Sequence, residues 1–568
     1  MSTISTTGPR TPGRRAAALA ALAAAGLILA AAALSACGTD TSQTSDQASD
    51  ASSCTDLAGT SIPASAIGLP TSGGYVARAQ LVSAEGTGET ATAEYCEVQA
   101  ALKPVDPNAQ NITMTIGLPT NWNNKAWMLG GGGYNGTERV VGGSWWDGGT
   151  PLITRGYVTF GSDSGHVGRS IDGHGLDGSF ALDGNKETID NYTGDALKKT
   201  HDAAVFLMNA RYGKTPERIY FVGGSTGGRE ALQVAQQWPT DFDGVVSMAP
   251  AWNGASLDLE FGRLTNVFSQ PGAWPNPAKQ TLIYNAVMDA CDGNDGASDG
   301  LISNPGGCHY DPHVLRCPDG TDTGDTCLSD VQVNALIAAD GSLKVNYPLA
   351  SGETGYPGFP FLSGMEMRDP KEDIGSKPPA NPTSSGSGFY MRFWEQWIRN
   401  FVTQDAKYNA LTVDPQNPGQ WQQRISELTE RQDINNPDLN AFATAGGKML
   451  IVHGTSDQIV SYRSTVDYFN RVQATMGSEA VNDFARLYLV PGFDHWTKAV
   501  AFNPLWDWAA ALDNWVENDQ APQSQVASDT TAEGNNRTRP LCEYPAWPKY
   551  NGTGDVNQAN NFTCVTAP

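Results

Sequence analysis

The segment Gly223–Gly227, which reads Gly-Gly-Ser-Thr-Gly, limits the fold of this chain more than any other stretch. It lies between an apolar run, Arg218–Val222, and a helix-like run, Gly228–Ala235. A G-x-S-x-G sequence between a strand and a helix is typical of a sharp turn that lifts the serine hydroxyl clear of a sheet. The helix N-terminus there faces developing negative charge. A Gly-Ser surface loop is the alternative, and the flanking strand and helix make it the weaker one.

An acid and a histidine follow this serine in the chain order that α/β-hydrolases use. Lys448–Gly454 indicates a buried parallel strand with Asp457 on the loop after it, and Ala485–Val490 indicates another strand, followed by His495. This fold presents its acid and its histidine at such strand ends. We therefore predict that Ser225 is a nucleophile, that His495 moves its proton and that Asp457 orients the imidazole.

Two other residues compete for these roles, in a chain with only 7 histidines. His453 lies so close to the end of its strand that a structural role suits it better. Asp494 is the rival acid, but it is adjacent to His495, and adjacent side chains rarely point the right way. Asp457 is therefore preferred as the acid.

A glycine-rich segment, Gly130–Gly133, follows the apolar run Ala126–Leu129. A loop of this kind after an early strand can aim a backbone amide at an oxyanion. We expect the amides of Gly132 and Thr226 to form the oxyanion hole. A flexible turn and a phosphate-binding loop are the alternatives, and no Gly-Lys-Ser/Thr follows to support the second.

These residues together resemble the tannase and feruloyl esterase family of α/β-hydrolases, over nearly all of the chain after its leader. The motifs that carry the resemblance are Gly130–Gly136, Arg155–Tyr157, Ser162–His166, Tyr220–Arg229, Trp238–Gly244, Ala249–Ala251, Asp292–Leu301 and Pro491–His495. The resemblance implies a serine carboxylesterase that forms an acyl-enzyme and needs no organic cofactor. It implies as substrate a small, possibly polymer-linked ester of a hydroxylated aromatic acid, of the feruloyl, galloyl or terephthalate-monoester type.

One departure from the family concerns the residues beside the nucleophile and the histidine. The family usually has a cysteine before the serine and another after the histidine, bridged beneath the active site. Gly224 and Trp496 occupy these positions here. Because both cysteines of the bridge are missing, no unpaired thiol remains. We expect Trp496 to pack over Gly224 and partly replace the bridge.

The N-terminus indicates export as a lipoprotein. Arg10, Arg14 and Arg15 precede the apolar run Ala16–Leu34, and Leu-Ser-Ala-Cys ending at Cys37 matches a bacterial lipobox. We predict a signal peptide over residues 1–36, lipidation of Cys37 and a disordered tether over residues 37–53. An ordinary signal peptide or a transmembrane anchor is the alternative. The expected location is the cell surface, lipid-anchored to the bacterial membrane, or the secreted fraction.

Of the 9 cysteines, eight remain once Cys37 is set aside. An even number in an exported chain favours disulfides, and the sequence alone does not give their connectivity. The family resemblance implies the pairs Cys54–Cys96, Cys291–Cys308, Cys317–Cys327 and Cys542–Cys564.

The balance of charge argues against nucleic acid as a partner. There are 60 acidic and 36 basic residues, for a net charge of −24. Such a charge repels phosphates and keeps an exported protein soluble. Outside the leader no run is long and apolar enough to span a membrane, so contact with a membrane is expected only through the lipid anchor.

Strand-like and helix-like runs alternate from Cys54 to Trp252, as in a doubly wound α/β sheet. Alternation lapses over residues 253–444, where Gly, Pro and Asp loops lengthen, and it resumes afterwards. We therefore predict an α/β-hydrolase domain in two parts, residues 54–252 and 445–568, with a large inserted lid domain between them.

An acidic loop, Asp292–Leu301, lies within the predicted lid. Three carboxylates spaced three and four residues apart with glycines between them suit a hard cation, and an acidic surface turn is the alternative. The resemblance implies structural Ca²⁺, held by the carboxylates of Asp292, Asp295 and Asp299 and the carbonyls of Ala297 and Leu301. Flanking Cys291 and Cys308 favour this interpretation.

The lid also contains an unusually aromatic run, Phe389–Phe401. One interpretation is a wall that binds an aromatic acyl group. The preferred interpretation is a helix face that packs the lid on the body. Trp145, Trp146 and Trp252 carry the same two interpretations.

Two other classes of function stay open. One is an exported serine peptidase on the same fold, which should prefer amide substrates and is not expected to carry the calcium-bearing lid. The other is a non-catalytic surface binding protein. The second is disfavoured because Ser225, Asp457 and His495 are all present, whereas decayed enzymes usually lose at least one such residue.

Overall fold

The computed structural model describes residues 52–88, 91–143, 149–168, 176–369, 374–495, 500–531, 534 and 536–566. All of them belong to one compact unit. The predicted signal peptide, Cys37 and most of the tether lie outside the described residues, as do Trp145, Trp146 and Trp496. No helix among the described residues is both long enough and apolar enough to cross a membrane.

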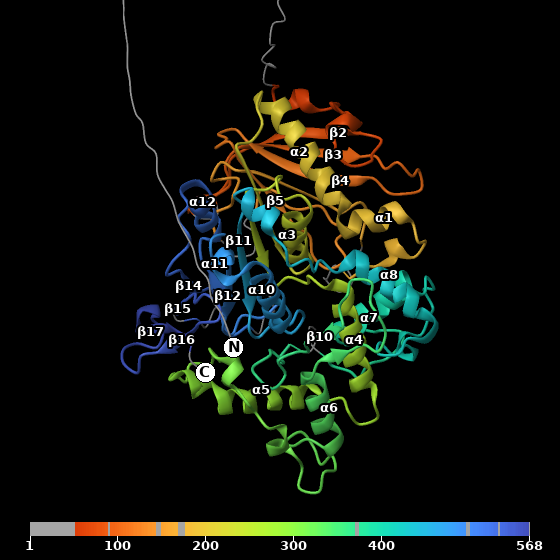
Figure 1. Cartoon of the computed structure of the whole chain (residues 1–568), viewed down its shortest axis with the longest axis vertical. Helices are drawn as coiled ribbons and strands as arrows, with labels where there is room; N and C mark the ends of the chain where they lie inside the picture. Colours follow the sequence, from red (N-terminus) through yellow and green to blue (C-terminus); the bar gives the residue numbers. More distant parts are fainter. Residues whose placement is uncertain are drawn as a thin grey trace, which may run out of the picture. The chain divides into compact units, whose positions relative to one another are not determined.

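A mixed ten-stranded sheet forms the centre of the molecule (Figure 1). Its strand order is β1-β2-β3-β4-β6-β5-β7-β8-β11-β12. The strands are β1 (Ser61–Ile62), β2 (Gly74–Val82), β3 (Tyr95–Leu102), β4 (Ile112–Pro119), β5 (Lys125–Leu129), β6 (Val158–Ser162), β7 (Arg218–Gly224), β8 (Gly244–Met248), β11 (Lys448–Gly454) and β12 (Ala485–Val490). From β6 to β12 in this order, all neighbours are parallel.

The first four strands correct one expectation. Strand–helix alternation was expected from Cys54 onward, but β1 to β4 follow one another without an α-helix and pair antiparallel, as do β4 and β6. Antiparallel neighbours can be joined by a simple loop, whereas parallel neighbours need a crossover, usually helical. The doubly wound part of the sheet therefore begins only at β5.

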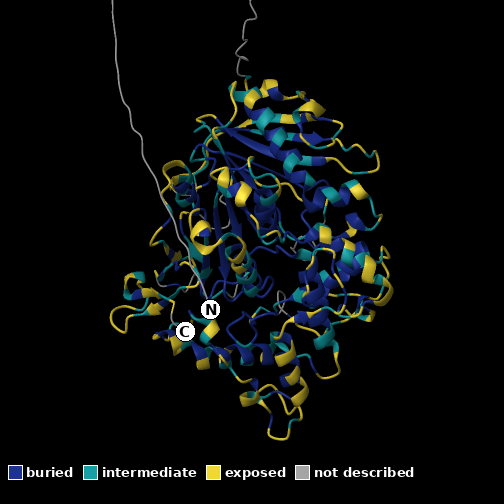
Figure 2. Ribbon diagram, in the orientation of Figure 1, coloured by how far each residue is buried: buried dark blue, intermediate teal, exposed yellow. Residues whose placement is uncertain are grey.

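Side chains alternate between the two faces of the parallel strands, so each strand contributes to two cores. Met128 and Phe221 face one core, while Trp127 and Val222 face the other. The first core is covered by α2 (Ala196–Tyr212), α3 (Thr226–Gln237), α10 (Tyr462–Met476) and α11 (Ser478–Asn482), and the second by α12 (Trp508–Asn518). Figure 2 shows the strands as mainly buried between these layers.

The segment between β8 and β11, predicted as the lid, is mainly helical and has its own core. It contains α4 (Gly254–Ser269), α5 (Pro277–Cys291), α6 (Asp330–Asp340), α7 (Phe389–Gln396), α8 (Gln422–Gln432), α9 (Asn440–Thr444) and the short strands β9 (Leu343–Lys344) and β10 (Gly355–Tyr356). Its core extends to Tyr134 and Tyr192 of the first part of the chain, so the lid packs on the body through apolar contacts. Helix α1 (Lys186–Asp190) precedes α2.

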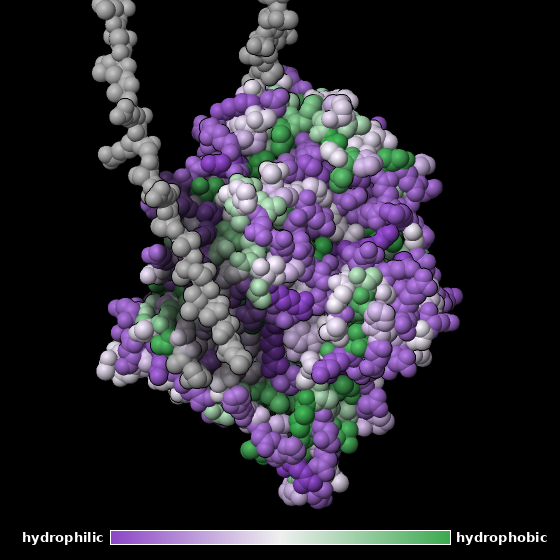
Figure 3. Space-filling view, viewed as in Figure 1, coloured by the Kyte–Doolittle hydropathy of each residue, from purple (hydrophilic) through white to green (hydrophobic). Residues whose placement is uncertain are grey.

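Four disulfides join the pairs that the family resemblance implies: Cys54–Cys96, Cys291–Cys308, Cys317–Cys327 and Cys542–Cys564. The last of these ties together the end of the chain, which carries β13 (Pro504–Leu505), β14 (Val526–Asp529), β15 (Thr538–Pro540), β16 (Trp547–Tyr550) and β17 (Phe562–Val565). Disulfides persist in oxidising compartments, so four of them suit an exported protein. The face seen in Figure 3 is largely hydrophilic, with apolar side chains in scattered patches.

Candidate active site

Ser225 lies on a turn between β7, which ends at Gly224, and α3, which begins at Thr226. Its φ of 58° and ψ of −121° fall in a region that side-chain-bearing residues rarely adopt. Backbone strain of this kind persists only where the surroundings hold it, and it clusters at functional sites. The local geometry is therefore that of the sharp turn which the G-x-S-x-G sequence predicts.

The glycines of this turn are required by close backbone approach. A Cβ on Gly223 would lie 2.2 Å from the carbonyl oxygen of Gly227, and one on Gly227 would lie 2.7 Å from the carbonyl oxygen of Gly131. Neither neighbour is a flexible side chain, so a larger residue at either position would displace the backbone. The turn thus packs directly on the glycine-rich loop that follows β5.

Asp457 and His495 form a hydrogen-bonded pair. Asp457 follows β11, His495 follows β12, and Asp457 Oδ2 lies 2.7 Å from His495 Nδ1. Asp457 is fully buried, whereas 9% of the His495 side chain is exposed. An acid that holds Nδ1–H leaves Nε2 as the base of the imidazole.

The Asp457 carboxylate is held from both of its oxygens. The backbone amides of Ile459 and Val460 donate to Oδ1 at 2.8 and 2.7 Å. Burial alone would raise the pKa of this carboxyl, but the contacts with His495 and His453 outweigh it and hold the pKa well below its usual range. Asp457 therefore stays ionised at neutral pH.

The three predicted residues lie at one edge of the sheet. Ser225, Asp457 and His495 follow the carboxyl ends of β7, β11 and β12, and only β8 lies between β7 and β11. Ligands of open parallel sheets bind outside the carboxyl ends of the strands. The end of β8 connects the Ser225 turn to strand β11. Ser225 N donates to Met248 O at 2.9 Å, and Ala249 N donates to Val452 O at 2.8 Å.

The loop after β5 is fastened to helix α3 by side chains. Gly131 N donates to Glu230 Oε2 at 2.7 Å, and Thr226 Oγ1 donates to Gly133 O at 2.6 Å. Gly132 N, expected as an oxyanion donor, donates to Asn135 Oδ1 at 2.6 Å. An oxyanion would therefore have to take the place of the Asn135 oxygen before the Gly132 amide could hold it.

A cavity of about 40 Å³ opens beside Thr226 and Gly133. Aromatic side chains line it, namely Tyr134, Tyr192, Phe261 and Phe393. The carboxyl of Asp258 lines it as well, with Oδ1 3.5 Å from the Tyr134 hydroxyl. Burial, with a smaller contribution from the charge of Asp433, raises the pKa of Asp258 well above its usual range.

Most aromatic side chains of the run at α7 are packed in the core of the lid, which agrees with the preferred interpretation of the sequence. Trp394 and Trp397 are fully buried, and their indole N–H groups donate to Ala410 O and Gln432 Oε1. Phe393 alone of these three also faces the cavity beside Thr226. Trp252 is likewise a core residue, since it is fully buried and donates to Ser464 O.

The acidic loop Asp292–Leu301 contains a carboxylate oxygen suited to a cation. Asp295 Oδ2 is buried and has no hydrogen-bond partner among the described residues, while Oδ1 accepts from Ala297 N at 2.9 Å. Burial and the charges of Asp299 and Asp292 raise the pKa of Asp295 to about 6. A bound cation would relieve both the missing partner and the mutual repulsion, so the loop fits Ca²⁺. Asp299 also forms an ion pair with the buried Arg539.

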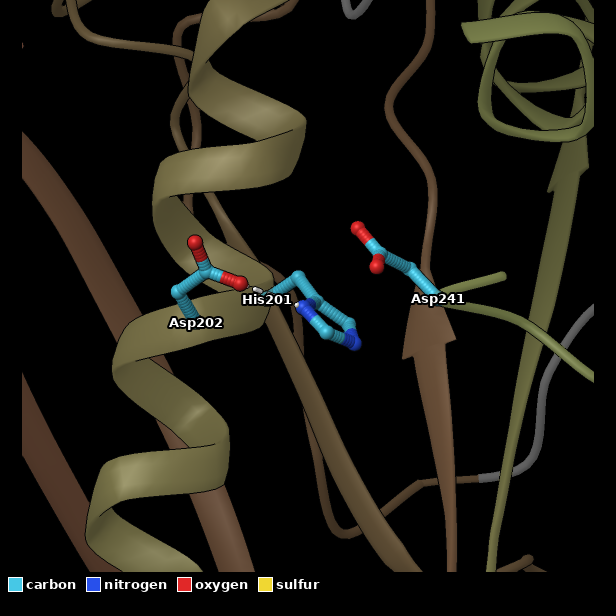
Figure 4. Close-up of side chains that lie close together, drawn as sticks. All are labelled: His201, Asp202 and Asp241. Atoms are coloured by element: carbon cyan, nitrogen blue, oxygen red, sulfur yellow. Dashed lines mark hydrogen bonds and ion pairs between the residues drawn. The ribbon is translucent and has the colours of Figure 1, made fainter. Parts of the chain in front are cut away.

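A second group of side chains has the spacing of metal ligands. Among the described residues, His201, Asp202 and Asp241 form a group whose candidate ligand atoms all lie within 4.8 Å of one another (Figure 4). The ammonium of Lys198 already lies 2.8 Å from a carboxylate oxygen of both Asp202 and Asp241. The positive charge of Lys198 therefore already neutralises these carboxylates, and we assign no metal there.

Sequence reasoning did not identify four residues that shape this site: Asn135, Glu230, Asp258 and His453 as a partner of Asp457. Glu230 and Asn135 lie just beyond the glycine motifs, and polar residues that flank such motifs are the signal that could have found them. Asp258 and His453 carry no such signal, because their importance depends on contacts between distant segments.

Comparison with known proteins identifies similar sequences over most of the chain. The protein-family model described as tannase and feruloyl esterase matches residues 96–565. An uncharacterized esterase from Agrobacterium fabrum is 38% identical, covering 90% of this chain and 93% of the relative. A mono(2-hydroxyethyl) terephthalate hydrolase from Piscinibacter sakaiensis is 30% identical, covering 84% of this chain and 85% of the relative.

Solved structures are similar as well. The crystal structure of feruloyl esterase B from Aspergillus oryzae matches with a TM-score of 0.72 at 23% identity, covering 87% of this chain and 97% of that one. At this identity the likeness shows the fold, and it confirms the predicted α/β-hydrolase architecture.

Proposed function

The chain belongs to the tannase and feruloyl esterase family and is a carboxylic ester hydrolase, and we propose that it cleaves esters of aromatic acids through an acyl-enzyme on Ser225. The observation that carries the proposal is the Asp457–His495 hydrogen bond, placed at the same sheet edge as the strained Ser225 turn. An ordered acid–imidazole pair at the same sheet edge as a half-buried serine is the arrangement that activates a hydroxyl nucleophile.

In the first half-reaction, Ser225 Oγ attacks the ester carbonyl carbon and gives its proton to His495 Nε2. The carbon–oxygen bond to the alcohol breaks, and the alcohol leaves with that proton. Asp457 keeps the imidazole in the tautomer with Nδ1–H and stabilises the imidazolium. In the second half, His495 Nε2 takes a proton from water as the water oxygen attacks the acyl carbon. The bond between that carbon and Ser225 Oγ then breaks, Ser225 Oγ recovers the proton from His495, and the acid is released.

The tetrahedral intermediates carry an oxyanion, which we assign to the amides of Thr226 and Gly132. Thr226 N is the first amide of α3, so the helix N-terminus adds its partial positive charge. Gly132 N would exchange Asn135 Oδ1 for the oxyanion. Donors fixed in position before the reaction need little reorganisation, and the Gly132 amide meets this condition once it has released Asn135 Oδ1.

The cavity beside Thr226 supports an aromatic acyl group. Its walls are aromatic, and the Asp258 carboxyl with the Tyr134 hydroxyl can hydrogen-bond a phenolic hydroxyl. Its volume of about 40 Å³ is smaller than the cavity of about 150 Å³ that binds benzene. Substrate binding therefore requires side chains of the lid, such as Phe393, to move outward.

We further propose that the enzyme is exported and lipid-anchored at Cys37, and that it binds one structural Ca²⁺. The carboxylates of Asp292, Asp295 and Asp299 and the carbonyls of Ala297 and Leu301 would hold the ion. The Cys291–Cys308 disulfide closes the segment that contains this loop. The ion would stabilise the lid rather than take part in the reaction.

The experiment is hydrolysis of methyl ferulate, methyl gallate, a terephthalate monoester and a short peptide amide, with calcium present. The purified protein is compared with its Ser225→Ala variant. We expect turnover of at least one aromatic ester, lost in the variant. Faster cleavage of the amide would favour a peptidase. Folded protein that binds the esters without turnover would favour a binding protein, and either result would refute the proposal.

A further inference from the structure

His453 is a fully buried imidazole that contacts the same oxygen of Asp457 as His495 does. It lies on β11, and its Nε2 is 3.2 Å from Asp457 Oδ2 and 2.9 Å from Val460 O. Its Nδ1 is 2.8 Å from the hydroxyl of Thr465 on α10. Every polar atom of this ring therefore has a partner.

These partners determine which ring nitrogen carries the hydrogen. Both neighbours of Nε2 are acceptors, one a carboxylate oxygen and the other a carbonyl oxygen, so Nε2 must be the donor. In the neutral ring Nδ1 then accepts from the Thr465 hydroxyl. The ring is held in one tautomer and one orientation by groups from α10 and from the loop between β11 and α10.

With this contact, every lone-pair site of the Asp457 carboxylate has a partner. Two amides donate to Oδ1, His495 Nδ1 lies 2.7 Å from Oδ2, and His453 Nε2 makes an ion-pair contact with the same oxygen at 3.2 Å. A carboxylate has about four lone-pair sites, so none is left over. The titratable groups that face it are the two histidines and Tyr356, whose hydroxyl accepts from Ser461 N.

His453 also braces the loop that orients Asp457. Val460 O accepts from His453, and Val460 N donates to Asp457 Oδ1, so one residue of the loop is fixed from both sides. Loss of the imidazole would free one lone pair of Oδ2 and loosen Val460. The carboxylate could then turn away from His495.

We propose that His453 is a positioning residue of the ester hydrolysis, which shares its Nε2–H between Asp457 Oδ2 and Val460 O and so directs the carboxylate toward His495. The inference rests on the proposed triad. It assigns to His453 a role that acts through Asp457, in place of a purely structural one. A purely structural role would affect folding and leave the orientation of His495 by Asp457 unchanged.

The experiment measures kcat and KM of His453→Leu and His453→Gln on the aromatic ester that the parent protein hydrolyses best. Leucine removes the donor, whereas the glutamine amide can place an N–H near the position of Nε2. We expect kcat to fall about 10- to 100-fold for leucine, as for loss of one hydrogen bond to a charged group, with KM little changed. Glutamine should recover most of the loss.

The decisive arm repeats the substitution in an Asp457→Asn background, at enzyme concentrations that make residual turnover measurable. If His453 acts through Asp457, His453→Leu has no further effect there, because the two changes are not additive. An equal fall in both backgrounds, or no fall in the parent, would overturn the inference. If Ser225→Ala or Asp457→Asn keeps full activity, the proposed triad fails instead.

Two further variants guard against misfolding. Thr465→Val removes only the hydroxyl that fixes Nδ1, and we expect a fall in kcat of about 3- to 10-fold that also disappears in the Asp457→Asn background. A fall that persists there would count against the proposal. His201→Leu is the matched control, since His201 is a buried histidine of α2 whose Nδ1 lies 2.8 Å from the adjacent acid, Asp202. It should lower thermal stability and leave kcat unchanged.

Discussion

Glu230 Oε2 accepts a hydrogen bond from the backbone amide of Gly131 at 2.7 Å, so a side chain of α3 holds the loop that follows β5. The other oxygen of the same carboxylate accepts from Asn135 Nδ2 at 2.6 Å. Glu230 is almost fully buried, with 2% of its surface exposed. The helix that starts after the proposed nucleophile thus also sets the position of the proposed oxyanion loop.

Glu230→Gln should lower kcat while changing KM little. The glutamine amide has the same shape and keeps one acceptor oxygen. Its NH₂ group, however, faces one of the two N–H donors, of Gly131 or Asn135, from which the carboxylate accepts a hydrogen bond. A lost hydrogen bond to a charged group costs about 1.5–3 kcal/mol, which corresponds to about 10- to 100-fold in rate. Steady-state kinetics on an aromatic ester measures the effect.

Glu187→Gln is the matched control for this substitution. Glu187 lies on α1 and accepts from two backbone amides, those of Val105 and Asp106, at 3.1 and 2.7 Å. Its replacement should reduce stability and leave kcat unchanged. If both variants lose activity equally, the effect of Glu230 is on folding and not on the oxyanion loop.

Thr226→Val should reduce kcat by about 3- to 10-fold. The valine keeps the amide that we assign to the oxyanion hole but removes the hydroxyl that donates to Gly133 O at 2.6 Å. A neutral hydrogen bond contributes about 0.5–1.5 kcal/mol, which sets the size of the effect. Thr226→Ser keeps the hydroxyl and should retain near-parental kcat, so a serine variant as impaired as the valine variant would contradict the role of this bond.

The elements that could be predicted correctly are those whose pattern lies within a short stretch of sequence. The Ser225 turn follows from five adjacent residues, and the strands before Asp457 and His495 are short apolar runs between loops. Because the order of strands in this fold brings such loops to one sheet edge, the meeting of Asp457 with His495 could be predicted without distances.

Contacts between distant segments could not be predicted in this way. Glu230 and Gly131 are separated by 99 positions, and no periodic pattern joins them. A run of glycines likewise indicates available amides but not which one is free, and Gly132 proves to be engaged by Asn135. The antiparallel pairing of β3 with β2 and β4 was missed because apolar runs alone do not reveal the direction of a neighbouring strand.

Removal of calcium should lower the melting temperature of the parent protein. An ion that binds the native state alone stabilises it increasingly with concentration. Asp295→Asn should abolish the calcium-dependent increase, because it weakens the site at the carboxylate that has an unpartnered oxygen. Thermal unfolding after treatment with EGTA, with and without added Ca²⁺, measures this.

The control for the calcium experiment is Asp319→Asn, which changes an exposed acid in the neighbouring acidic stretch. It should keep the full calcium response. A parent protein whose melting temperature does not respond to Ca²⁺ would refute the proposed site.

Protonation of His166 should destabilise the protein in mild acid. His166 is fully buried, and its Nε2 contacts the carbonyl oxygen of Tyr134 in the proposed oxyanion loop at 2.7 Å. Burial lowers the pKa of His166 to about 4, against about 6.5 in the unfolded chain. Since the unfolded state binds the proton first, this group contributes stability that is complete above about pH 6.5 and is lost as the pH falls toward 4.

His166→Gln removes this titration and can keep an N–H for the Tyr134 carbonyl. The free energy of unfolding of the parent protein should therefore fall more steeply than that of the variant between pH 6.5 and 4, by at most about 1.4 kcal/mol per pH unit for one proton. Denaturant unfolding at a series of pH values measures both slopes, and all other titrating groups are common to the two proteins. Equal slopes would show that His166 takes up its proton without unfolding, and the loop at Tyr134 would then have to rearrange in the native state to accommodate the charge.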